Sequence, residues 1–201
     1  MKFYILLIGF FLSKLGNCQP EILLLGNTKQ LCLIDSNSRF ISSEKLPLSL
    51  TEFDAIMVFS SAHSKLPSSD IDQIIQFLAS GGGLYIGSEN WPLQSEGILI
   101  TERIFSKSAW TTVENSKKEI SNAGIFSEIS EFPPGLTPVV FPLDYQLRVE
   151  VWYNDEPLIL TGRVGKGKIL IDGGYSRFYC QSLGKQENEV LKIVLDYLTE
   201  P

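Results

Sequence analysis

Short runs of apolar residues, separated by polar and glycine-rich segments, recur along the chain after its first 20 residues. Ile22–Leu25 and Phe53–Phe59 are two such runs. Continuous apolar runs of this length, bounded by turn residues, are typical of strands buried on both faces of a parallel sheet. A further short strand is predicted at Gln30–Asp35. The first part of the chain therefore favours a buried sheet.

After Phe59 the apolar positions change to the period of a helix. Four of them share one helical face at the spacing i, i+3, i+4 and i+7: Ile71, Ile74, Ile75 and Leu78. Gly81–Gly83 are expected to end this helix, and Leu84–Gly87 follow as the next strand. A strand, a helix and a second strand in this order predict a βαβ unit with parallel strands and a right-handed crossover.

The second half of the chain predicts a mixture of helices and antiparallel strands. The expected elements are helices at Ile98–Lys107, Glu114–Ala123 and Glu187–Leu198, a half-exposed strand at Leu147–Trp152, and a hairpin of Leu158–Val164 and Lys168–Ile171. The hairpin turns through Gly165–Gly167, where glycines tolerate a positive φ. Together these elements predict an α/β protein with a mainly parallel sheet and a late antiparallel hairpin.

The N-terminus has the pattern of a secretory signal peptide. Lys2 supplies a positive charge, Phe3–Leu12 is an apolar run too short to span a bilayer, and Ser13–Cys18 resembles a cleavage region. Residues 1–18 are therefore predicted to be removed, leaving residues 19–201 as a single exported domain in the periplasm or outside the cell. The alternative is a lipoprotein that is anchored to a membrane through acylated Cys18.

Composition excludes some partners and cofactors. The formal net charge is −6, from 17 Lys and Arg against 23 Asp and Glu. An acidic chain without a basic run does not suit nucleic-acid binding. One histidine and dispersed cysteines do not suggest a zinc site or any other metal site. Gly81–Gly83 precede a strand instead of a helix, and Gly165–Gly167 lack the spacing of a phosphate-binding loop, so no cofactor is predicted.

Two cysteines remain after the predicted cleavage, Cys32 and Cys180. Outside the cytoplasm they could form a disulfide. Cys32 lies in an apolar run, so a buried thiol is the preferred interpretation for it. Both alternatives stay open at this point.

Three segments resemble the class I glutamine amidotransferase-like superfamily. They are Phe53–Val58 with Gly81–Ile86, Pro157–Gly174 around its Arg163–Lys168 core, and Gln186–Glu189 with the helix end Asp196–Leu198. The likeness is greatest to the superfamily's non-enzymatic branch, which includes gliding-motility and ABC-transporter accessory domains and a domain of an intraflagellar-transport subunit. The resemblance implies a flavodoxin-like three-layer sandwich and a role in binding or assembly.

The resemblance does not extend to catalysis. The amidotransferases use a Cys nucleophile at a strand-to-helix turn together with a His. At the matching turn this chain has Gly87-Ser88-Glu89-Asn90, and its only histidine, His63, follows an earlier strand. The alternative enzyme is a hydrolase or carbohydrate-active protein that uses Ser88, Glu89 and His63. A serine in a polar loop and a solvated histidine explain these residues better.

Aromatic residues on loops are the remaining candidates for contact with a ligand or partner. Trp91, Tyr175, Arg177 and Tyr179 are predicted to form such a surface, because they follow strands of the expected parallel core. The predicted partner is a protein in the cell envelope or a small ligand. A membrane enters only if Cys18 carries a lipid.

Overall fold

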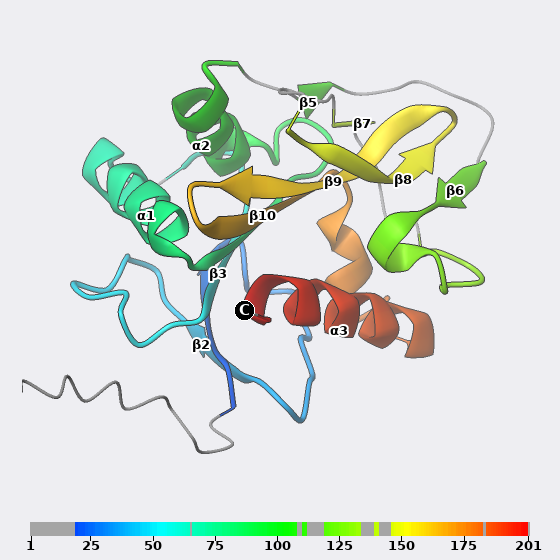
Figure 1. Cartoon of the computed structure of the whole chain (residues 1–201), viewed down its shortest axis with the longest axis horizontal. Coiled ribbons are helices and arrows are strands. Elements are labelled where there is room, and N and C mark those ends of the chain that lie inside the picture. Colours follow the sequence, from blue (N-terminus) through cyan, green and yellow to red (C-terminus); the bar gives the residue numbers. More distant parts are fainter. Residues whose placement is uncertain are drawn as a thin grey trace, which may run out of the picture.

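The computed structural model describes residues 19–64, 66–107, 110–111, 119–133, 139–140, 146–182 and 184–200. Within these residues, eight strands form one sheet in the order β2-β1-β3-β4-β10-β9-β8-β6 (Figure 1). The strands from β2 to β10 in this order are parallel, and β9, β8 and β6 continue the sheet in antiparallel pairs. The predicted α/β class, with a mainly parallel sheet and a late antiparallel hairpin, is confirmed.

The elements have the following bounds. The strands are β1 (Glu21–Gly26), β2 (Arg39–Ser42), β3 (Ala55–Phe59), β4 (Gly83–Gly87), β5 (Trp110–Thr111), β6 (Ile120–Asn122), β7 (Val139–Val140), β8 (Arg148–Tyr153), β9 (Glu156–Val164) and β10 (Gly167–Asp172). The helices are α1 (Ser68–Ser80), α2 (Ser95–Phe105) and α3 (Lys185–Thr199), with short 3-10 turns η1 (Gly124–Phe126) and η2 (Tyr175–Phe178). None of these described helices is long and apolar enough to cross a bilayer.

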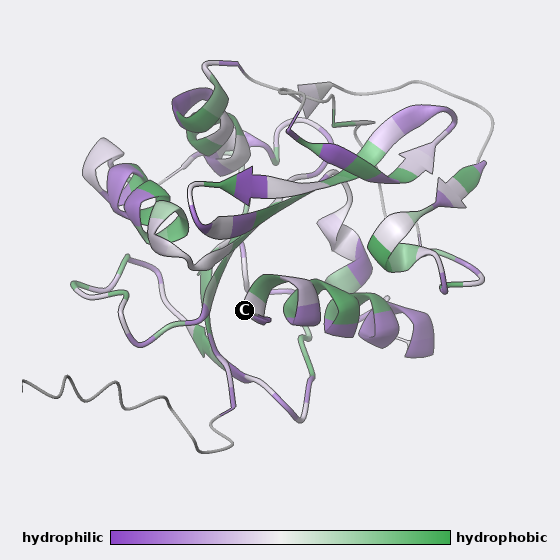
Figure 2. Cartoon of the chain, viewed as in Figure 1, coloured by the Kyte–Doolittle hydropathy of each residue, from purple (hydrophilic) through white to green (hydrophobic). Residues whose placement is uncertain are grey.

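Helices cover both faces of the sheet, which explains the unbroken apolar run of β3. Met57 and Phe59 point into one core with α3, whereas Ile56 and Val58 point into the other core with α1 and α2. Apolar colour follows the central strands and the facing sides of the helices (Figure 2). Successive strand residues face opposite sides, so a strand between two helical layers must be apolar at every position.

The predicted βαβ unit is present as β3, α1 and β4. Gly81 ends α1 with a φ of 125°, and the N–H groups of Gly81 and Gly82 donate to the carbonyl oxygens of Leu78 and Phe77. This positive φ is the conformation that favours glycine at the end of a helix. The predicted helices at 98–107 and 187–198 correspond to α2 and α3.

Two predicted elements are wrong. Gln30–Asp35 is not a strand: the partner of β1 is β2, and Leu31 makes only an isolated bridge to Tyr179. The physical reason is that this segment lies beyond the end of β1, where it pairs with the loop after η2. The expected helix at 114–123 is replaced by β6 at its end, and residues 114–118 lie outside the described residues.

The alternation expected for β8 is broken at Glu150. A register shift between Val149 and Val151 places the side chain of Glu150 inside, where it is 2% exposed. Thr161 Oγ1 donates to its carboxylate at 2.6 Å and the N–H of Ile125 donates at 3.0 Å. A bulge shifts the side-chain alternation by one residue, which apolar patterning alone does not reveal.

Only one glycine of the β9–β10 turn has a positive φ, Gly165 at 60°. Gly167 is required for a different reason, because a Cβ there would meet the carbonyl oxygens of Leu78 and Gly82. We expect Gly167→Ala to lower the free energy of unfolding by about 1–3 kcal/mol through this overpacking. Urea unfolding measures the change, with exposed Lys166→Ala as the matched control. Equal urea midpoints for the two variants would contradict this steric role.

Candidate functional site

The strand order places a topological switch point between β1 and β3. From β1 the chain passes to β2 on one side of the sheet and then to β3 on the other. Open α/β sheets bind ligands in the crevice outside the carboxyl ends of strands at such a point. A cleft of about 340 Å³ lies there, which we call the carboxyl-edge cleft. Its lining residues are Gly26, Asn27, Thr28, Lys29, Ser42, Ser43, Glu44, Ser61, Leu66 and Glu96.

The lining of the carboxyl-edge cleft is polar and carries charges of both signs. Lys29 and Glu44 are exposed at its walls, and Glu96, the acidic residue in the first turn of α2, is buried. The Glu96 carboxylate accepts hydrogen bonds from the N–H of Ser61 at 2.6 Å and from its hydroxyl at 2.8 Å. Glu96 therefore fixes the loop after β3.

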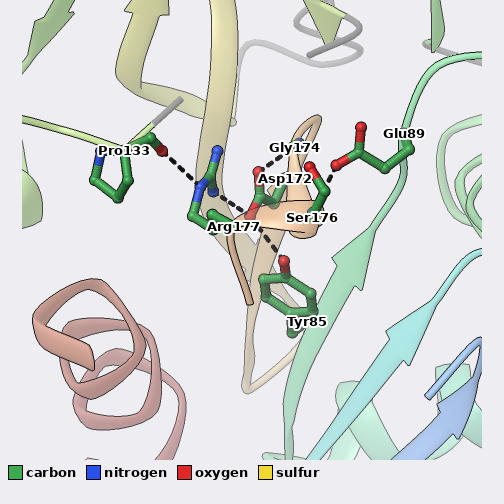
Figure 3. A network of polar contacts seen from close by, with 7 residues as sticks. All are labelled: Tyr85, Glu89, Pro133, Asp172, Gly174, Ser176 and Arg177. Carbon is green, nitrogen blue, oxygen red and sulfur yellow. Dashed lines mark hydrogen bonds and ion pairs between the residues drawn. The ribbon is translucent and has the colours of Figure 1, made fainter. Parts of the chain in front are cut away.

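A buried polar network occupies the same edge of the sheet, at the end of β10 (Figure 3). Asp172 is its centre: Tyr85 Oη donates to Oδ2 at 2.7 Å, Arg177 Nη1 donates to Oδ2 at 2.5 Å, and the N–H of Gly174 donates to Oδ1 at 2.8 Å. The side chains of Asp172 and Arg177 are 1% and 0% exposed. Three hydrogen bonds to one carboxylate are the arrangement that a buried charge requires.

Arg177 is held on its other side as well. Its Nε donates to the carbonyl oxygen of Pro133 at 2.9 Å, and its guanidinium lies 4.9 Å from the centre of the Phe132 ring. The predicted place of Arg177 on a contact surface is therefore wrong, because η2 turns its side chain into the protein. A buried guanidinium that already has an anion, a carbonyl oxygen and an aromatic ring around it serves the fold.

Tyr175 is also buried, contrary to its predicted place on the surface. Its hydroxyl donates to the carbonyl oxygen of Ser60 at 2.8 Å and accepts from Asn27 Nδ2 at 3.2 Å. Tyr175 thus connects the core to Asn27 in the cleft wall. Of the other predicted contact residues, Tyr179 is half-buried and Trp91 is 79% exposed.

The alternative catalytic residues are not assembled into a triad. Ser88 is buried, and its Oγ lies 2.8 Å from Ser60 Oγ, which accepts the N–H of Gly97 at 2.9 Å. His63 is exposed on the loop after β3, and within the described residues no hydrogen bond joins it to Ser88 or Glu89. A nucleophile needs its base within hydrogen-bond reach. The hydroxyl of Ser88 is part of the packing between β4 and α2.

Glu89 is buried with half of its carboxyl group satisfied. The N–H of Ser176 donates to Oε1 at 2.6 Å (Figure 3). Among the described residues, Oε2 has no hydrogen-bond partner. Burial raises the pKa of Glu89 from 4.5 to about 8. Because an unpaired buried carboxylate is costly, the group is held in its neutral form near neutral pH.

Glu89 is expected to make stability fall with rising pH. Unfolding releases its proton between pH 4.5 and about 8, so the free energy of unfolding decreases through that window. Between about pH 5 and about pH 7 the decrease is roughly 2–3 kcal/mol, at about 1.4 kcal/mol per pH unit. Glu89→Gln removes this dependence in urea unfolding, whereas the exposed control Glu128→Gln keeps it. Identical pH profiles for Glu89→Gln and the parent would contradict the assignment.

Cys32 and Cys180 are joined in the structure by a disulfide with an S–S distance of 2.09 Å. The N–H of Cys32 donates to the carbonyl oxygen of Phe178 at 3.0 Å, and that of Cys180 donates to Gln30 at 2.9 Å. The bond therefore fastens the loop after β1 to the loop after η2. Cys32 is half-buried and Cys180 is exposed, so the buried thiol preferred from the sequence is wrong and the alternative, a disulfide, is present as a surface cross-link.

Sequence patterns alone missed the carboxyl-edge cleft and Asp172. The available signal for the cleft was the position of Asn27 and Ser61 just after buried strands, but the strand order was needed to bring them together. The signal for Asp172 was an acidic residue between an apolar strand and two glycines. Among the described residues, no cluster of three metal-ligating side chains is present.

Comparison with known proteins identifies the fold. No family model matches the chain, and no curated protein matches it in sequence. A Salmonella typhimurium LT2 protein, STM1381, superimposes with a TM-score of 0.61 at 14% identity, over 89% of this chain and 99% of that one. A ThuA-like protein of Parabacteroides merdae gives 0.60 at 10% identity, over 90% and 91%. The chain has the class I amidotransferase-like fold. The IFT52 N-terminal domain is also similar, with a TM-score of 0.55 at 15% identity, over 89% and 98%.

The prediction of export is wrong by this comparison. STM1381 and a second Salmonella typhimurium protein, STM3548 (TM-score 0.56, 12% identity, over 86% of this chain and 97% of that one), are both named cytoplasmic proteins. Those names conflict with an exported or periplasmic location. The predicted signal peptide and Cys18, residues 1–18, lie outside the described residues.

Proposed function

We propose that this chain is a non-catalytic binding module that holds a small polar ligand in the carboxyl-edge cleft. The observation that carries the proposal is a contrast between two neighbouring regions. At the strand ends where the superfamily has its nucleophile, Ser88 and Glu89 are buried and bonded to the protein's own groups. At the switch point, a cleft of about 340 Å³ is open and lined mostly by polar residues.

The chemistry of the cleft favours a neutral or zwitterionic compound. Hydroxyl groups and an amide line it, with Lys29 and Glu44 as exposed charges of opposite sign. A phosphate group fits poorly, because the first amides of α2 are already used. The N–H of Ser95 donates to Ser61 O at 3.1 Å and that of Gly97 donates to Ser60 Oγ at 2.9 Å.

Binding and hydrolysis are tested with the same panel of amino acids, polyols and nucleosides, supplemented with glutamine and simple esters. We expect at least one panel compound to raise Tm, and Thr28→Trp, which fills the cleft, to abolish the rise. Thr51→Trp is the matched control, because Thr51 lines a different pocket beside Phe53 and Gly81. Hydrolysis that Ser88→Ala abolishes would overturn the proposal, as would a Tm rise that Thr28→Trp leaves intact.

A protein partner is the second candidate, and the observation that favours it is Trp91. The indole is 79% exposed on the turn between β4 and α2, where backbone hydrogen bonds from Glu89 to Leu93 O and from Leu93 to Asn90 O fix the turn. A large aromatic side chain held on a fixed turn suits a protein contact. If Trp91→Ala no longer captures the partner but keeps the Tm shifts that the panel compounds cause, the protein contact is assigned to Trp91.

A further inference from the structure

The disulfide lies at the base of one wall of the carboxyl-edge cleft. Gly26–Lys29 form that wall, and the chain then runs through Gln30 and Leu31 directly to Cys32. The opposite side of the disulfide, Cys180, follows η2, whose Tyr175 accepts a hydrogen bond from Asn27 in the wall. The covalent bond and the wall therefore belong to one connected unit.

Without the covalent bond, few contacts would hold the far end of this wall, Thr28 and Lys29. The N–H groups of Cys32 and Cys180 donate across the two loops, and the N–H of Leu31 donates to Thr28 O at 3.2 Å within the wall. The start of the wall is attached independently of the disulfide, because the N–H of Asn27 donates to Phe59 O at 2.8 Å and its Nδ2 donates to Tyr175 Oη at 3.2 Å. Beyond Asn27, Lys29 and Gln30 are exposed, and the contacts described for this segment run to the loop after η2 that the disulfide joins. Segments with few buried contacts and exposed backbone hydrogen bonds open locally, well below global unfolding.

We propose that reduction of Cys32–Cys180 loosens the Thr28–Lys29 end of the wall and weakens ligand binding in the cleft, so that the module is controlled by thiol redox state. This inference rests on the proposed function and names its regulation. The exposure of Cys180 makes its sulfur accessible to a reductant, whereas Cys32 is half-buried. Surface disulfides are the ones that thiols reach, and accessible disulfides recur in regulatory roles.

The chemical step is a thiol–disulfide exchange with a dithiol. A thiolate of the dithiol attacks Cys180 Sγ, the S–S bond breaks, and Cys32 leaves as a thiolate that takes a proton. The second thiol of the dithiol then attacks the mixed disulfide, which releases Cys180 as a thiol. The protein disulfide gains two electrons and two protons, and the dithiol becomes a disulfide.

Amide hydrogen exchange of the ligand-free full chain, with and without dithiothreitol, tests the loosening. We expect protection of the Leu31, Cys32 and Cys180 amides to fall at least about tenfold on reduction, as expected for local opening. The amides of the buried strands β1 and β3 should remain more protected from exchange than these three amides. The Cys32→Ser/Cys180→Ser variant should match the reduced parent and ignore dithiothreitol. If reduction leaves the exchange rates of these three amides unchanged, the proposal of redox control is overturned.

Measuring the ligand affinity of the oxidised and the reduced protein separates the redox proposal from the proposed function. The probe is whichever panel compound gave the Tm shift that Thr28→Trp abolishes, and its Kd is expected to rise at least about fivefold on reduction, the lower end of typical coupling between sites. Equal Kd values for the oxidised and reduced parent would overturn the regulation and leave the proposed function standing. A loosened wall without cleft-dependent binding would overturn the proposed function, although the redox-sensitive loop would remain.

Discussion

Replacing Arg177 with methionine is expected to lower the free energy of unfolding by about 3–5 kcal/mol, because it leaves a charged carboxylate buried without its cation. Asp172 is 1% exposed at its side chain, and Arg177 is its only salt-bridge partner among the described residues. The change also removes the bond to Pro133 O and the contact with Phe132. Urea unfolding followed by circular dichroism measures the loss.

Two controls separate the buried pair from a general effect of losing an arginine. Arg103 forms an ion pair with Asp72 on the surface, with side chains 56% and 43% exposed, so Arg103→Met should cost less than about 1 kcal/mol. Adding Asp172→Asn to Arg177→Met removes the stranded charge and should restore part of the loss. If Arg177→Met proved as mild as Arg103→Met, the Asp172 network would not be a main support of the fold.

Removing the disulfide is the second change with a large expected effect. The cross-link joins positions separated by 148 residues, so it restricts most of the unfolded chain. In the chain-entropy description, a closed loop of this size contributes about 4–5 kcal/mol to the free energy of unfolding. We expect Cys32→Ser/Cys180→Ser to lose stability by about this amount in urea unfolding, and the reduced parent to behave like the variant. A urea midpoint that neither change moves would show that the cross-link does not stabilise the protein.

The sequence predicted the core of the fold because apolar periodicity reports burial directly. The run at Ile22–Leu25 and the helical stripe of α1 each have one physical explanation, and the structure confirms both. The failures occur where the local structure depends on contacts that apolar periodicity does not report. Glu150 turns inward through a bulge, and residues 30–32 pair with residues 178–180 instead of with β1.

The candidate site was less predictable for the same reason. Tyr175 and Arg177 follow a strand of the parallel sheet, as expected, but η2 directs both inward. Whether a polar side chain on a loop faces solvent or the core depends on partners that are distant in the sequence, such as Ser60 O for Tyr175. The cleft likewise depends on the strand order, which brings Asn27 beside Ser61.

The most direct test is two-dimensional amide NMR of the labelled full chain during titration with the polar panel. One-dimensional proton spectra of the same samples follow the compounds, so that one titration reports both binding and chemical conversion. The predicted result is a set of shifts confined to the amides of residues 26–29, 42–44 and 61, with every compound recovered unchanged. Shifts centred on Ser88 and Ser176, or on Thr51 in the other pocket, would contradict a ligand site at the β1–β3 switch point. Conversion of a panel compound would contradict a non-catalytic module.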